Sequence, residues 1–422
     1  MGRDVRLWRP LGILVAALAL TMPALASAAQ QGGAKTKKVN YDAVYTQSND
    51  PSGNSVIVFT RAANGTLTQT KVVSTGGKGI AGTAPFGFPI VDSSGSVNLT
   101  SDGKLLFVVN AGDNTVSSFQ VTASGPKLVS KVSSHGKLPI SLTSSGDLLY
   151  VVNETSQNIF GWKFSSTGKL TPIAGSDRKL TAVTPKGKKD KVGVTAGIGF
   201  ANNGAIIAVT QRGLPRTYGE IDTFVISKSG AAGPSQATAT PGIPNPFGFS
   251  ASGKQLLVSN AGFVATPSGA MPNPTDPTQF NGTAATYNVS STGKLKLVKN
   301  TSTNGRAACW LVVTKNGRWA FVSNTLSDSV PDTFTGKGGV SVMSVGAGGK
   351  MTLKGQGNLG GPGFPSDEAL SSNDRYLYIV DPFIMGGPSH IDVFKVASNG
   401  SITHIQTTPS TLPNGVSGMA AF

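Results

Sequence analysis

The chain has 422 residues, of which 13% are charged and 54 are glycine, and its formal net charge is +16. The low charge and the many glycines exclude a protein built on long amphipathic helices, which need charged and unbranched residues in a 3.6-residue period. The single cysteine, Cys309, excludes an intrachain disulfide, and its apolar neighbours predict a buried thiol. The positive charge favours anionic partners, but the lysines are scattered and no nucleic-acid-binding motif occurs, so we expect no nucleic-acid partner.

The first residues have the pattern of a signal peptide. Three arginines precede an uncharged apolar run at residues 11–20, and the small residues at 26–28 offer a cleavage site. The run is shorter than the roughly 20 apolar residues that cross a bilayer as a helix, and Pro23 interrupts it. We therefore predict a signal peptide at 1–28, with an uncleaved anchor as the alternative. The remainder, 29–422, is expected to be one secreted or periplasmic domain with no transmembrane anchor.

A short pattern recurs through the rest of the chain. Leu99–Asn110 and Leu142–Asn153 are its clearest copies, and each predicts a short strand, a glycine-containing hairpin and an apolar strand ending in a polar residue. A second pair of strands follows most copies, as in Thr115–Val121 and Leu128–Val132, where apolar and polar residues alternate. The copies start roughly 43 to 64 residues apart, which is typical of four-stranded β-propeller blades. Further copies begin at Phe200, Phe249, Val313 and Leu370.

The ends of the chain supply the pieces of one more unit. Residues 43–73 contain three predicted strands without an inner one, and residues 415–422 form a lone predicted strand. Pairing the two would close a ring and remove the exposed strand edges that favour aggregation. We therefore predict an all-β fold, a seven-bladed β-propeller of four-stranded antiparallel blades, closed by the C-terminal strand joining the N-terminal blade. The six uninterrupted units start near Val97, Ile140, Val194, Phe247, Trp310 and Glu368.

Long connections are expected on one face of this ring. The turns within the hairpins are tight, whereas the second-to-third-strand loops and the blade-to-blade loops contain the insertions. Loops lengthened on one face of a rigid scaffold usually carry its binding site. The long connections are Ser74–Ser96, Gly175–Gly193, Arg212–Gly219, Ala261–Asn281, Thr325–Gly338 and Pro382–Ser389.

The repeated pattern Leu/Phe-x-x-x-Gly-Lys-x-Leu-Phe/Leu-Val-x-Asn, followed by a Val-x-x-Phe-x-Val strand and a Gly-Lys-Leu turn, resembles the seven-bladed lactonase family. That family includes propeller-type 6-phosphogluconolactonase and the fungal 3-carboxymuconate cyclase. The resemblance implies an enzyme for anionic lactones or dicarboxylates, in which arginine holds the anion and histidine or glutamate moves a proton. The pattern is also similar to YVTN-type and surface-layer propellers, which implies binding without catalysis.

Charged residues in one long connection are the best candidates for such a site. Arg212 and Arg216 would clamp an anion and Glu220 would act as base, the alternative being a solvated loop with a surface ion pair. His135 precedes Pro139 without the compact His–Pro pattern of the family enzymes. The catalytic candidates are Glu220 and His135, and the ligand-binding candidates are Arg212, Arg216, Arg306 and Asp381.

No metal and no cofactor are expected. The three histidines are spread widely along the chain, and no nucleotide-binding motif is present. We expect a monomer whose partner is an anionic small molecule or an acidic polymer. Two functions remain open: an exported enzyme that hydrolyses or cyclises an anionic sugar lactone or related acid, or a non-catalytic surface or periplasmic propeller that binds a polysaccharide or a protein.

Overall fold

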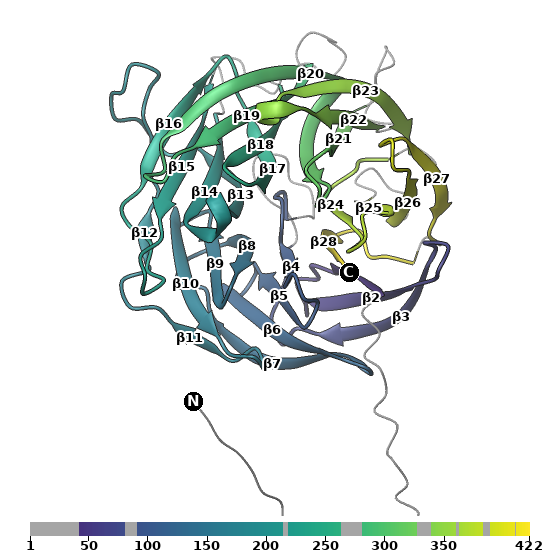
Figure 1. Cartoon of the computed structure of the whole chain (residues 1–422). Helices are drawn as coiled ribbons and strands as arrows, with labels where there is room; N and C mark the ends of the chain where they lie inside the picture. The colour runs from purple at the N-terminus through teal and green to yellow at the C-terminus, as the bar shows by residue number, and fades with distance from the viewer. Residues whose placement is uncertain are drawn as a thin grey trace, which may run out of the picture. The chain divides into compact units, whose positions relative to one another are not determined.

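The computed structural model describes residues 42–80, 91–213, 218–262, 281–326, 339–359, 363–382, 389–409 and 411–422. They belong to one compact unit, Val39–Phe422. The described residues form antiparallel β-strands and two single-turn 3-10 helices, and none of their helices has the length and hydrophobicity needed to span a membrane. The unit is an all-β propeller whose sheets follow one another in chain order around a ring (Figure 1).

The strands occupy four positions from the axis outward. The inner strands are β28 (Ser417–Ala421), β4 (Val97–Leu99), β8 (Pro139–Ser145), β13 (Val194–Ala201), β17 (Pro246–Ser252), β20 (Leu295–Val313) and β24 (Glu368–Leu370), and each contacts the next around the ring. The second strands are β1 (Ala43–Gln47), β5 (Leu105–Asn110), β9 (Leu148–Asn153), β14 (Ile206–Arg212), β18 (Gln255–Asn260), β21 (Trp319–Leu326) and β25 (Tyr376–Asp381). The third strands are β2 (Ser55–Arg61), β6 (Thr115–Thr122), β10 (Asn158–Phe164), β15 (Tyr218–Val225), β19 (Asn281–Val289), β22 (Gly339–Val345) and β26 (His390–Val396). The outermost strands are β3 (Leu67–Ser74), β7 (Gly125–Ser133), β11 (Leu170–Pro172), β12 (Arg178–Lys179), β16 (Gln236–Pro241), β23 (Met351–Asn358) and β27 (Ile402–Thr407).

The burial of each strand follows its position. The second strands β5 and β9, with sequences LLFVVN and LLYVVN, are buried on both faces because each sheet lies between two others. The outer strand β7 faces solvent and is mostly exposed. The continuous apolar runs of the sequence repeat therefore mark the second strands.

One strand joins two sheets. The 19-residue β20 pairs with β19 through its first part and with β21 through its last part, so the strands β17 to β23 form a seven-stranded sheet. Arg306 lies at the changeover, opposite Asn281 on one side and Leu326 on the other. Asn304 and Ala307, on either side of Arg306, have positive φ angles of 53° and 51°, so the backbone departs from regular strand geometry where it passes from one sheet to the next.

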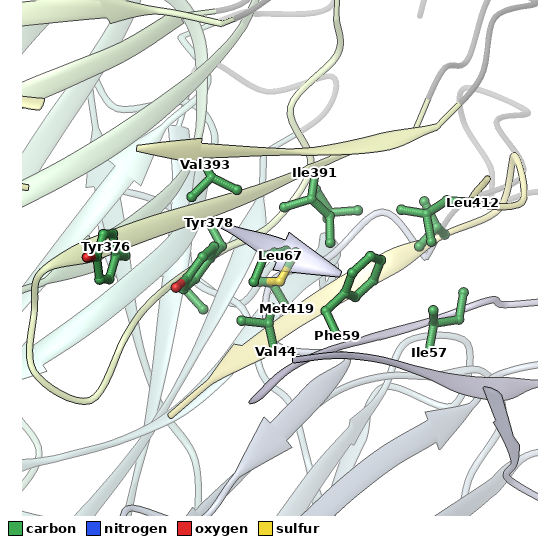
Figure 2. Packing of buried hydrophobic residues seen from close by; sticks show 13 residues of the cluster. Val44, Ile57, Phe59, Leu67, Tyr376, Tyr378, Ile391, Val393, Leu412 and Met419 are labelled. Carbon is green, nitrogen blue, oxygen red and sulfur yellow. The ribbon is translucent and has the colours of Figure 1, made fainter. Parts of the chain in front are cut away.

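The C-terminal strand completes the sheet made by the N-terminal strands. β28 pairs with β1 antiparallel, with Tyr45 opposite Ala420, and the sheet has the order β28-β1-β2-β3. Met419 of β28 packs with Phe59 of β2 and Tyr378 of β25 in one buried cluster (Figure 2). The two ends of the described unit are thus held together by a sheet and a shared apolar core.

A central segment, residues 91–96, lies against the inner strands of several sheets. It belongs to the connection between β3 and β4, and its polar groups form hydrogen bonds with residues of several sheets. The hydrogen bonds run from Ser93 Oγ to the Ile140 carbonyl, from Ser94 N–H to the Ala196 carbonyl, from Trp310 Nε1–H to the Ser93 carbonyl and from Gly95 N–H to Asp367 Oδ2, at 2.6 to 3.0 Å.

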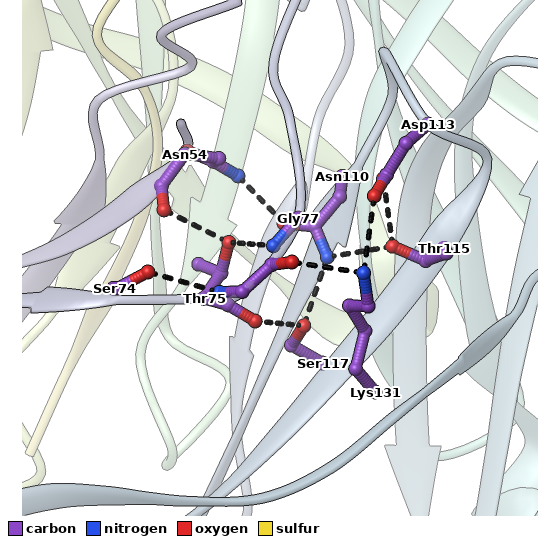
Figure 3. A network of polar contacts seen from close by, with 10 residues as sticks. Asn54, Ser74, Thr75, Gly77, Asn110, Asp113, Thr115, Ser117 and Lys131 are labelled. Atoms are coloured by element: carbon purple, nitrogen blue, oxygen red, sulfur yellow. Dashed lines mark hydrogen bonds and ion pairs between the residues drawn. The ribbon is translucent and has the colours of Figure 1, made fainter. Parts of the chain in front are cut away.

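The polar residue at the end of each second strand belongs to a network that we call the terminal rung. In the β4–β7 sheet, Asn110 Nδ2 donates to Thr115 Oγ1 at 3.0 Å and to Ser117 Oγ at 2.8 Å (Figure 3). The Ser117 hydroxyl then donates to the Thr75 carbonyl at 2.8 Å. A Cβ on Gly77 would lie only 2.3 Å from the Asn110 side chain, so this glycine is required where the outer strand returns over the rung. The rung joins the end of one sheet to the beginning of the next.

Candidate functional site

Arg212, at the end of β14, is held by the central segment. Its side chain is 2% exposed, and Nη1 donates to Asp92 Oδ2 at 2.5 Å. The guanidinium lies over the Phe247 ring, 5.1 Å from its centroid. Burial by itself lowers the pKa of Arg212, but the carboxylates of Asp92 and Glu154 outweigh burial and raise it above its ordinary value. Arg212 is therefore permanently charged and held in place, and Asp92 is its ion-pair partner.

Glu154 supplies a carboxyl group that can exchange protons near neutral pH. Burial raises its pKa to about 7, the Arg212 guanidinium lowers it in part, and the Asp92 carboxylate raises it further. The residue is half-buried, and its main-chain N–H is fixed to the Leu138 carbonyl at 2.8 Å. A carboxyl with a pKa matched to the working pH is suited to general acid–base catalysis.

The position of Glu154 follows from the repeat. It comes directly after the polar residue that ends β9, and Arg212 comes directly after Gln211, the equivalent residue of β14. The two charged side chains thus occupy the same position in neighbouring sheets, which accounts for their interaction. In the other sheets this position carries Ser48, Ala111, Ala261, Thr325 and Pro382. An alignment of the repeats in the sequence would have shown the charged pair.

Cys309, in β20, completes the surroundings of Arg212 without chemistry of its own. The residue is buried, and burial raises the pKa of its thiol to about 12. A thiol with such a pKa is not a nucleophile at neutral pH. The sequence prediction of a buried thiol is confirmed.

The structure does not bring Arg212 and Glu220 together. Gln211 lies opposite Glu220 in the β14–β15 register, so these two side chains share one face of the sheet and Arg212 occupies the other. Glu220 accepts a hydrogen bond from the Val183 N–H on its own face, whereas Arg212 packs on Phe247. The expected clamp and base are therefore separated by the sheet. Arg216 lies outside the described residues.

The other sequence candidates lie apart from Arg212. His135 is exposed, and its ring stacks on Phe160 of the third strand β10 with 3.8 Å between centroids. Arg306 is buried within β20. Asp381 is buried at the end of β25, where burial raises its pKa to about 7 and Oδ1 accepts the Phe364 N–H at 2.7 Å. None of the three is among the charged groups that shift the pKa of Glu154 or Arg212.

Two further buried carboxyl groups, Asp367 and Glu368, make contacts between separate segments of the ring. Burial raises the pKa of Asp367 to about 7 and that of Glu368 to about 8. Asp367 Oδ2 accepts the N–H groups of Gly95 and Met419 at 3.0 and 3.3 Å. Glu368 accepts the Ser323 hydroxyl. The Asp367 contacts join the central segment to β28, and the Glu368 contact joins β24 to β21, so both carboxyl groups have a structural role.

The fold and this cluster define an all-β propeller with a titratable carboxyl group beside an ion-paired guanidinium. Comparison with known proteins identifies the family to which this propeller belongs. The family model for "Lactonase, 7-bladed beta-propeller" matches residues 52–184 and 140–262, which together span half of the chain. The protein belongs to this lactonase β-propeller family. No curated protein sequence matches it.

Several solved structures share the fold. A Bacteroides fragilis protein described as a candidate 6-phosphogluconolactonase is 17% identical, with 90% of this chain and 98% of that chain covered and a TM-score of 0.63. The periplasmic gluconolactonase of Pseudomonas aeruginosa is 15% identical, with 88% and 98% covered and a TM-score of 0.61. At this level of identity the likeness establishes the fold, and the chemistry must be argued from this chain's own residues.

Proposed function

We propose that this protein is a seven-bladed lactonase-type propeller that binds an anionic sugar lactone beside Glu154 and Arg212 and hydrolyses it. The β17–β23 sheet counts as two blades divided at Arg306, which gives seven four-stranded units with the closing sheet included. The observation that carries the proposed activity is the Glu154 carboxyl group, which interacts with the permanently charged Arg212 and whose pKa is raised by burial to about 7.

Each residue of the cluster has a defined task in this reaction. Deprotonated Glu154 accepts a proton from a water molecule as the water oxygen adds to the lactone carbonyl carbon. The Arg212 guanidinium stabilises the negative charge that develops on the carbonyl oxygen. The tetrahedral intermediate then breaks its bond to the ring oxygen, which takes the proton from Glu154. The products are the open hydroxy acid and regenerated Glu154 carboxylate.

Asp92 sets the charge and the position of Arg212. The ion pair with Asp92 fixes the orientation of the planar guanidinium, which a flexible lysine side chain would not provide. Arg212 Nε–H is buried and has no hydrogen-bond partner, so the group keeps a donor that Asp92 does not use. The net charge of +16 would attract an anionic substrate over longer distances.

Export fits the same proposal. The basic, apolar and small-residue segments of residues 1–28 have the order of a signal peptide. A similar fold is found in the periplasmic gluconolactonase of Pseudomonas aeruginosa. We therefore propose that the mature protein is secreted or periplasmic and meets its sugar lactone there.

A non-catalytic binding propeller is the second candidate. It is favoured by the separation of Arg212 from Glu220 on opposite faces of the β13–β16 sheet, since the site expected from the sequence is not assembled. In that case the cluster would bind a sugar acid or acidic polymer without turnover.

The two candidates are separated by a matched pair of variants. Hydrolysis of glucono-δ-lactone and its 6-phosphate is measured for the parent, Glu154→Gln and Glu220→Gln. General acid–base groups contribute about 10²–10⁴-fold, so Glu154→Gln should lower kcat/KM by at least about 100-fold. Glu220 lies in the same sheet as Arg212 but on its opposite face, so Glu220→Gln should retain parent activity. A parent that hydrolyses neither lactone, or a Glu154→Gln variant as active as the parent, would overturn the proposal.

A further inference from the structure

One terminal rung differs from the others in chemistry. In the β4–β7 sheet the rung positions are Asn110, Thr115 and Ser117, and in the β24–β27 sheet the same register positions are Asp381, His390 and Asp392. An amide and two hydroxyl groups are thus replaced by two carboxyl groups and an imidazole. The rung of the β24–β27 sheet therefore consists of groups that can ligate a metal ion, whereas that of the β4–β7 sheet consists of neutral hydrogen-bonding groups.

The neutral rungs show what this position needs for stability alone. Asn324 Nδ2 donates to Ser341 Oγ at 2.8 Å, which repeats the Asn110–Ser117 bond that Figure 3 shows. In the β13–β16 sheet, Asp222 is acidic but accepts hydrogen bonds from Gln211 Nε2 and the Ser235 hydroxyl. In these rungs Asn110 Oδ1, Asn324 Oδ1 and Asp222 accept hydrogen bonds from the protein, whereas the amide oxygen of Asn153, at the end of β9, is buried without a hydrogen-bond partner.

The acidic rung leaves a buried oxygen without a donor. Asp381 is fully buried, its Oδ1 accepts the Phe364 N–H at 2.7 Å, and its Oδ2 has no hydrogen-bond partner. A buried carboxylate oxygen in this state is destabilising unless a cation or a donor fills the space beside it. Asp381 Oδ2 lies 3.7 Å from His390 Nε2.

We propose that Asp381 Oδ2, His390 Nε2 and Asp392 Oδ2 bind one divalent transition-metal ion of the Zn²⁺ or Mn²⁺ class. The separations fit such an ion: His390 Nε2 lies 3.3 Å from Asp392 Oδ2 and 3.7 Å from Asp381 Oδ2. All three ligand atoms lie within 4.8 Å of one another. Ligands at about 2.1 Å from a tetrahedral ion lie about 3.4 Å apart, and one imidazole with two carboxylates is a donor set that Zn²⁺ accepts. Water completes the coordination.

The surrounding residues hold the ligands in place. Asp392 Oδ1 accepts the Thr407 hydroxyl at 2.7 Å and lies 2.7 Å from His404 Nε2, which leaves Oδ2 turned toward His390. Asp381 Oδ1 is held by Phe364 in the same way. In both carboxylates one oxygen is fixed by the protein and the other faces the cluster, an arrangement typical of the support around metal ligands.

The site is independent of the proposed lactone chemistry, so its test uses metal binding alone. The full-length chain without a polyhistidine tag is stripped with EDTA, dialysed and titrated with Zn²⁺ and separately with Mn²⁺ by calorimetry. Bound metal is counted by elemental analysis, and the melting temperature is measured with and without the ion. We expect one ion per chain and a higher melting temperature with metal, because an ion that binds only the folded state stabilises it.

Three variants and a control decide whether the ion lies in this rung. Asp381→Asn restores the amide of the neutral rungs and should weaken binding at least about 100-fold, while Thr407→Ala should weaken it about 10-fold. His135→Ala removes an exposed imidazole elsewhere and should bind like the parent. If Asp381→Asn does not fold, His390→Gln takes its place. A parent that binds neither ion, or an ion that remains bound to both Asp381→Asn and His390→Gln, overturns the site.

Discussion

Replacement of Asp92 by asparagine tests whether the central segment is held by charge. The variant keeps the size of the side chain and leaves the Arg212 guanidinium, which is 2% exposed, without its carboxylate. Removing one partner of a buried ion pair typically costs about 3–5 kcal/mol, because the other charge stays buried and uncompensated. The Asp92 side chain is 12% exposed, so solvent offsets part of this cost and we expect about 3 kcal/mol.

The free energy of unfolding is measured by urea denaturation for Asp92→Asn, Arg212→Met and the double variant. Because the double variant has no unpaired charge, its loss should be smaller than the sum of the single losses by about 1–3 kcal/mol. Lys104→Ala is the control: its pair with Asp102 is 62% and 53% exposed, and such a pair contributes at most about 1 kcal/mol. A loss below about 0.5 kcal/mol for Asp92→Asn, or strict additivity in the double variant, would refute the reasoning.

Three further outcomes follow from the buried groups and the ring closure. The folded pKa values of Asp367 and Glu368, about 7 and about 8, lie above the ordinary 3.8 and 4.5, so the folded protein keeps protons that the unfolded chain releases. The free energy of unfolding should therefore fall as the pH rises from about 4 to about 8. The double variant Asp367→Asn, Glu368→Gln should show a smaller difference in this free energy between pH 5 and pH 8, measured by urea denaturation. Deletion of residues 415–422 removes β28 and the buried Met419, so the variant should melt at a lower temperature and aggregate through the exposed edge of β1. Differential scanning calorimetry measures the melting and light scattering the aggregation, and an unchanged melting temperature would contradict the closure of the ring by β28. Gly305→Ala would place a Cβ 2.2 Å from the Asn324 side chain and should cost about 1–3 kcal/mol by urea denaturation, while Gly355→Ala, which meets nothing within 4 Å, should cost much less.

The strands could be predicted from the sequence because the repeat is local. The pattern that ends in Asn110, Asn153 or Asn324 specifies an apolar strand buried on both faces. The amides of Asn110 and Asn324 donate to a serine at the same third-strand position, whereas the Asn153 amide donates to the Ser134 carbonyl. The pairing of β28 with β1 could also be predicted, since the ends of the chain supplied complementary pieces of one sheet.

The site could not be predicted because it depends on register and on a connection without a repeat. Asp92 comes from a connection that has no equivalent elsewhere in the sequence, and only the folded ring brings it to Arg212. Arg212 and Glu220 are close in sequence, but the register between β14 and β15 decides which face each side chain takes. Asp381 and His390 were visible as strand ends, whereas their position beside Asp392 required the pairing of β25 with β26.

The pH dependence of lactone hydrolysis tests the central claim most directly. Glu154 is active as a carboxylate, so kcat/KM of the parent, corrected for uncatalysed hydrolysis, should rise with pH through an apparent pKa of about 7 and then level off. In Glu154→Gln this step should disappear along with most of the activity, while Glu220→Gln should keep both. A parent profile with no step near pH 7, or a step that survives in Glu154→Gln, would contradict the assignment of Glu154 as the base.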